Sequence, residues 1–72
     1  MTNDDLNVKA LAAVFCELNE KGIDIKSIKQ SAQAGVMGMK KYAPASAAQK
    51  PQIAEVIEKA YDSAQYYIGL DG

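Results

Sequence analysis

The stretch Lys21-Gly22-Ile23-Asp24 decides how this chain folds, because it ends one amphipathic segment and starts the next. Gly22 suits the left-handed conformation that often follows a helix C-terminus, and Ile23 supplies the apolar contact that accompanies it. Asp24 is a good N-cap, since its carboxylate can accept hydrogen bonds from the first N–H groups of a helix. The turn therefore predicts one helix that ends at residue 21 and another that begins at residue 25.

The segment before this turn, residues 4–21, has apolar residues at helical spacing. Asn3 is placed to cap it, and Asp4 and Asp5 lie where the positive end of a helix dipole favours carboxylates. On a helical wheel the apolar residues fall within an arc of roughly 120°. We expect this arc to face the core, and its members are Val8, Leu11, Val14, Phe15 and Leu18.

The segment after the turn, residues 25–41, has three different faces. The apolar face consists of Ile25, Ile28, Ala32, Val36 and Met39. One flank is basic and polar, with Lys26, Lys29, Gln33 and Lys40, and the other is small, with Ser27, Ser31, Ala34 and Gly38. Each glycine inside a helix costs roughly 0.5–1 kcal/mol relative to alanine. The sequence therefore leaves open whether this helix is continuous or kinked at Gly35 and Gly38.

A third helix is predicted over residues 51–69. The preceding residues 42–50 form a linker, since Pro44 lies in a run rich in Ser and Ala, and Pro51 suits the first turn of a helix. The apolar stripe of this helix is Ile53, Val56, Ile57, Ala60, Ala64 and Tyr67, with Glu55, Glu58 and Asp62 expected on the opposite side. Three amphipathic helices in 72 residues predict an all-α fold, a small three-helix bundle in a single helical domain.

The composition argues against an enzyme. The chain has no His and no Arg, which removes the usual proton shuttle at neutral pH and the side chain best suited to phosphate or guanine. Cys16 is the only cysteine, so it cannot form an internal disulfide, and the neighbouring Glu17 disfavours a reactive thiolate. No apolar run approaches the roughly 18 residues that cross a membrane, and the N-terminus is acidic. We expect a cytoplasmic protein with no membrane contact, cofactor or metal.

Charge is segregated along the chain. Residues 25–54 contain five lysines and no acid, whereas residues 1–24 and residues 55–72 each carry a net charge of −3. The overall charge of −1 hides this pattern. Segregated charge creates a local field that can steer a partner or orient self-association.

Three further patterns have simpler interpretations than the functions they suggest. A Gly-containing turn before a basic helix follows the helix-turn-helix plan, but Leu18 stands where a small residue is expected. Gly35 and Gly38 have the spacing of an RNA-binding loop, yet no strands surround them. Two acidic stripes have oxygen ligands suitable for Ca²⁺, but both point away from the apolar faces, as solvated acids do. Their members are Glu17, Glu20 and Asp24, and Glu55, Glu58 and Asp62.

We therefore interpret the chain as a non-enzymatic protein-interaction module that self-associates or docks on a protein partner. Exposed Met and Tyr are common at interfaces, and lysines can pair with the carboxylates of a second copy. The expected contact residues are Lys26, Lys29, Gln33, Met37, Lys40, Tyr66 and Leu70. The alternative is a small helix-turn-helix-like DNA-binding regulator that uses residues 25–41.

Overall fold

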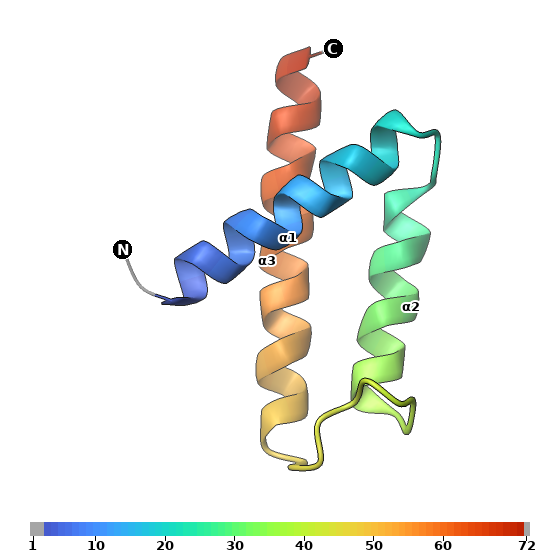
Figure 1. Ribbon diagram of the computed structural model, residues 1–72, viewed down its shortest axis with the longest axis vertical. Helices are drawn as coiled ribbons and strands as arrows, with labels where there is room; N and C mark the ends of the chain where they lie inside the picture. The colour runs from blue at the N-terminus through green and yellow to red at the C-terminus, as the bar shows by residue number, and fades with distance from the viewer. Residues whose placement is uncertain (1–2, 72) are drawn as a thin grey trace.

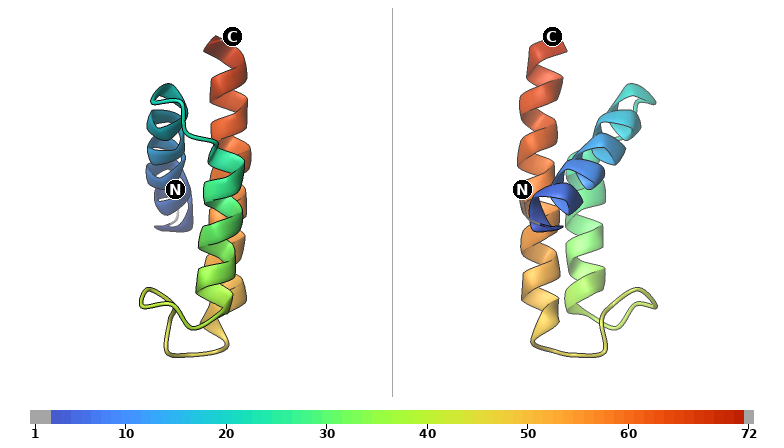
Figure 2. Two further views of the ribbon diagram at one scale, coloured as in Figure 1. Left: turned by 90° about the vertical axis from the view of Figure 1, so that its right-hand side faces the viewer. Right: turned by 60° about the vertical axis from the view of Figure 1, so that its left-hand side comes forward.

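The computed structural model describes residues 3–71, and within that range the chain forms three helices and no strand. These helices are α1 (Asn3–Glu20), α2 (Ile25–Met37) and α3 (Gln49–Asp71). α2 and α3 run antiparallel and side by side, and α1 crosses obliquely in front of α3 (Figure 1). Seen edge-on, α1 forms a second layer on one face of the α2–α3 pair (Figure 2). The predicted all-α three-helix bundle is confirmed, as a flat molecule of 39 × 29 × 13 Å.

The turn between α1 and α2 has the predicted geometry. Gly22 adopts a positive φ of 81°. Its N–H donates to the Asn19 carbonyl at 3.0 Å, and the Ile23 N–H donates to the Leu18 carbonyl at 3.0 Å, which is the bonding pattern of a Schellman motif. The Asp24 carboxylate accepts a hydrogen bond from the Lys26 N–H at 3.1 Å. Gly22 therefore ends α1 and Asp24 caps the start of α2, as the sequence predicts.

The outer ends of the helices differ slightly from the prediction. α1 begins at Asn3, one residue before the expected start, and the capping roles expected of the Asn3 and Asp4 side chains lie outside the described residues. α3 begins at Gln49, two residues before the predicted start, and runs to Asp71. Pro51 thus lies in the first turn, as expected, because a proline there leaves no hydrogen bond unmade.

α2 is continuous but shorter than predicted. It ends at Met37 and not at residue 41, because Gly38 leaves the helical region with φ −96° and ψ −137°. The Gly38 N–H still donates to the Ala34 carbonyl at 2.9 Å, and the Lys50 ammonium donates to the Gly38 carbonyl at 3.0 Å. Residues 38–48 form a loop, so the glycine ends the helix and does not kink it. Met39 is consequently off the helix and 98% exposed, against the expectation that it faces the core.

The core is centred on α3, which packs against both other helices, whereas α1 and α2 contact each other little. Small residues lie where α1 crosses α3: Ala12 is 1% exposed, and Ala60 and Ala64 are 0% exposed. Their size lets the two backbones approach closely. Phe15 packs edge-to-face on Tyr61 with ring centroids 6.0 Å apart, and the remaining buried apolar residues are Ile25, Val36 and Ile57.

Several residues predicted to be buried are partly exposed. Val14 is 52% exposed, and Ile28, Ile53 and Tyr67 are also open to solvent. Val14 is exposed because the buried arc of α1 is centred on Ala12 and Phe15, which turns Val14 away from α3. The oblique α1 also leaves the ends of the α3 stripe open and covers little of α2. None of the helices in residues 3–71 combines the length and apolarity needed to cross a membrane.

Candidate functional site

A polar cluster joins α2 to α3 along their shared edge. The Lys29 ammonium lies 3.3 Å from both carboxylate oxygens of Glu58 and 4.6 Å from the centre of the Tyr61 ring. The Gln33 side-chain amide donates to Glu58 at 3.0 Å and to the Ala54 carbonyl at 3.1 Å. Lys29 is largely buried by these contacts, with 13% of its side chain exposed. The cluster therefore fixes the register of the two helices.

The environment of Glu58 favours its ionised form. The hydrogen bond from Gln33, followed by the hydrogen bond and positive charge of Lys29, lowers the pKa of the Glu58 carboxyl below its ordinary value.

The contacts of Glu58 with Lys29 and Gln33 correct the expectation that Glu58 points away from the fold. α1 and α2 pack on two different flanks of α3, so the buried arc of α3 is wider than one stripe. A second row, Ala54, Tyr61 and Ile68 at seven-residue intervals, was the sequence signal for the α2 flank.

The predicted contact residues do not form one surface. Lys29 and Gln33 bond to α3 within the fold, as described above. Lys26, Met37, Lys40, Tyr66 and Leu70 are all exposed. Because α2 and α3 are antiparallel, Met37 lies near the start of α3, whereas Tyr66 is near its other end, on the order of 20 Å away along the helix axis.

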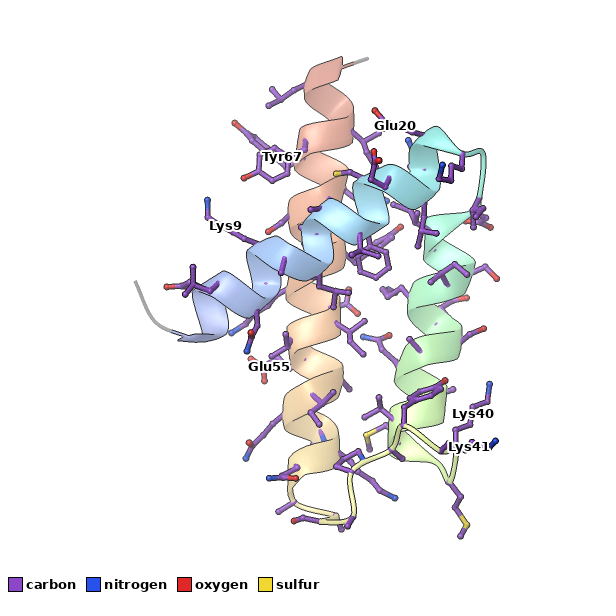
Figure 3. All side chains as sticks on the ribbon, viewed as in Figure 1. Lys9, Glu20, Lys40, Lys41, Glu55 and Tyr67 are labelled. Carbon is purple, nitrogen blue, oxygen red and sulfur yellow. The ribbon has the colours of Figure 1, made fainter. Side chains whose placement is uncertain are left out.

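The lysines of the acid-free segment are also dispersed. Figure 3 shows Lys40 and Lys41 in the loop at one end of the molecule, with Tyr67 near the opposite end of α3. Lys40 is off the helix and 6.0 Å from the Tyr42 ring centre, and Lys50 is bonded to the end of α2. The lysines of residues 25–54 are therefore divided among an internal ion pair (Lys29), the exposed Lys26, a loop (Lys40 and Lys41) and the end of α2 (Lys50). The helix-turn-helix alternative uses residues 25–41, and within that range Lys29 and Gln33 are already bonded to α3 and are not free to contact DNA.

A further exposed apolar surface lies on α1, where the sequence did not predict a site. We define the α1 outer face as two adjacent helical rows, Leu6, Ala10 and Ala13, and Asn7, Leu11 and Val14, of which Leu11 is half-buried and packs against the core. Leu6 is 54% exposed and Val14 is 52% exposed, and Ala10 and Ala13 are exposed as well. Beside the second row lies a hollow of about 380 Å³ lined by Asn7, Leu11, Gln52, Ile53 and Val56.

The other candidate sites are a second hollow, the lone cysteine and the acidic stripe of α1. A more polar hollow of about 250 Å³ lies between α1 and α3 and is lined by Asp5, Val8, Gln52, Glu55, Val56 and Lys59. Cys16 is half-buried against the core. In the acidic stripe of α1, the hydrogen bond and negative charge of Glu17 raise the pKa of Glu20. Among residues 3–71 no three acids, cysteines or histidines are grouped so that they could hold a metal ion.

Comparisons with protein-family models, with curated proteins and with solved structures gave no match, so the function must be argued from the residues of this chain.

Proposed function

We propose that the chain is a non-enzymatic protein-interaction module that acts by self-association. The observation that carries this proposal is the surface area of the monomer. A compact monomer of 7.7 kDa exposes about 4,300 Å², whereas this chain exposes 5046 Å². The excess, about 700 Å², is close to the ~800 Å² that each partner buries in a standard protein interface.

The chemistry of the exposed surface supports the same proposal. Large apolar side chains are open to solvent on every helix, including Leu6, Met37, Tyr66 and Leu70. The Tyr66 and Tyr67 rings also pack edge-to-face, with centroids 5.6 Å apart, and both are exposed at the surface. Contiguous apolar patches larger than a few hundred Å² are rare on monomers and mark interaction sites. We place the protein in the cytoplasm, on the support that its lone cysteine has no second cysteine in the chain to pair with.

Sedimentation equilibrium over a wide concentration range tests the proposal. We expect the average mass to rise from monomer towards dimer as the concentration increases. Repeating the series with duplex DNA at low salt separates the alternative, because a DNA-binding protein forms a complex whose affinity falls steeply with added salt. A protein that stays monomeric at every concentration, or that associates only when DNA is present, would contradict self-association.

A further inference from the structure

We propose that the α1 outer face is the interface between two copies of this chain, and that the two α1 helices pack antiparallel about a two-fold axis near Ala10. This inference rests on the proposed function and names its surface. It differs from the expectation drawn from the sequence, which placed the contact on residues 25–41 and on the C-terminal tyrosine region.

The first argument is that the middle of α1, residues 6–16, is apolar on nearly all sides. Residues 6–16 read LNVKALAAVFC, in which Asn7 and Lys9 are the only polar residues. Its inner side packs on α3 through Ala12 and Phe15, yet the opposite side carries the exposed Leu6, Ala10, Ala13 and Val14. A helix that is apolar all round belongs in an interior. The fold of one chain covers only half of this helix.

The second argument is that the face is self-complementary in shape. Ala10 and Ala13 are small, so a second helix can approach closely along the middle of the face. Leu6 and Val14 lie four residues on either side of Ala10. In an antiparallel pair centred there, Leu6 of one copy meets Val14 of the other, and the contact is repeated by the two-fold axis, as in an isologous interface.

The third argument is that charge and area suit a second copy. From Leu6 to Val14 both rows of the face are uncharged, so a two-fold axis brings no like charges directly together. The hollow that adjoins Leu11 and Ile53 extends the apolar surface from α1 onto α3. The excess area of about 700 Å² belongs to the whole chain, and it is of the size that each partner buries in a standard interface.

A matched pair of charge insertions tests the inference. Ala10 and Ala34 are both exposed alanines on helices, so Ala10→Glu and Ala34→Glu add the same charge to different faces. We expect Ala10→Glu to raise the dimer dissociation constant at least tenfold, or about 1.4 kcal/mol or more, because two carboxylates meet at the axis. Ala34→Glu should leave it unchanged. Circular dichroism checks that both variants keep the wild-type helix content.

A cross-link gives a second readout that does not depend on weakening the dimer. A residue on a two-fold axis lies opposite itself, within the 4.4–6.8 Å Cα separation that a disulfide spans. In a Cys16→Ser background, Ala10→Cys should form a covalent dimer on mild oxidation, and Ala34→Cys should not. If the wild type dimerises but Ala10→Glu does so equally well and Ala10→Cys does not cross-link, the α1 interface is wrong and self-association stands. If the wild type never dimerises, the proposed function itself fails.

Discussion

At the scale of single residues, the Tyr42 side chain occupies the space that a Cβ at Gly35 would fill. The Tyr42 ring lies over this glycine, and a Cβ built there would come within 2.6 Å of the ring carbon Cζ. Tyr42 is partly exposed and reaches Gly35 from the 38–48 loop. The glycine therefore serves loop docking, although its position inside α2 weakens the helix.

Gly35→Ala, made with and without Tyr42→Ala, measures how far contact with the Tyr42 ring offsets the stability that alanine adds to the helix. In the Tyr42→Ala background the new methyl group meets no ring, so the helix should gain about 0.5–1 kcal/mol. With Tyr42 present, the ring must move away, and the gain should be at least ~0.5 kcal/mol smaller because the two sites are coupled. Urea unfolding of the four proteins measures the difference. Equal effects in both backgrounds would show that the ring does not rest on this glycine.

Glu58 predicts a pH dependence whose sign follows from its environment. Because the pKa of Glu58 is lowered from 4.5, its ionised form stabilises the fold above the unfolded pKa. That contribution is lost as the pH falls through the lowered folded value. The pKa of Glu20 is raised, so its effect has the opposite sign, and stability rises as Glu20 is protonated. A comparison of wild type with Glu58→Gln cancels the Glu20 effect, since both proteins contain it.

We therefore expect Glu58→Gln to be less stable than wild type at about pH 7, with the difference shrinking towards about pH 3. Urea unfolding followed by circular dichroism across this range measures it. A difference that stays constant with pH would mean that the ion pair with Lys29 does not contribute through the charge of Glu58.

At the scale of helices, the alanines at the α1–α3 crossing decide how closely the two layers pack. Ala64 has no exposed surface, so Ala64→Leu must force the helices apart. Overpacking of this kind costs typically 1–3 kcal/mol, a large part of the 3–5 kcal/mol that a domain of this size rarely exceeds. Ala34→Leu, on the exposed side of α2, should change stability by less than about 0.5 kcal/mol. Thermal unfolding of the two variants compares them, and similar losses would argue against a tight crossing.

The end of α1 and the start of α2 could be predicted from the sequence, but the faces that the helices bury could not. Gly22 and Asp24 act on their nearest neighbours, so the end of α1 and the start of α2 follow from local chemistry. Val14 and Glu58 depend on where other helices cross, which no local pattern records. The sequence prediction placed Val14 inside and Glu58 outside. Both were wrong, because the buried arc of α1 is centred on Ala12 and Phe15 and because α3 has two buried flanks. The same holds for the predicted contact residues: Lys29 and Gln33 bond to α3 within the fold, and the sequence of α2 alone does not show this.

At the scale of the whole molecule, two thin layers share a small core that is rich in alanine. Among the residues whose burial the structure describes, 5–70, three of the seven buried apolar residues are alanines. Each contributes less buried area than a larger side chain would. A small domain with a core of this kind gains stability from anything that binds its folded form. Self-association through α1 would therefore be part of the stability of the fold and not only a property added to it.

This coupling predicts that the unfolding temperature depends on protein concentration. If the folded chain dimerises and the unfolded chain does not, a tenfold increase in concentration should raise the midpoint by about 3–5 °C. Ala10→Glu should remove the dependence and unfold at the temperature of dilute wild type, because its outer face is no longer covered. Ala34→Glu should keep the dependence. Calorimetry at several concentrations measures all three proteins, and a wild-type midpoint that does not move with concentration would mean that α1 is stable with one side in water.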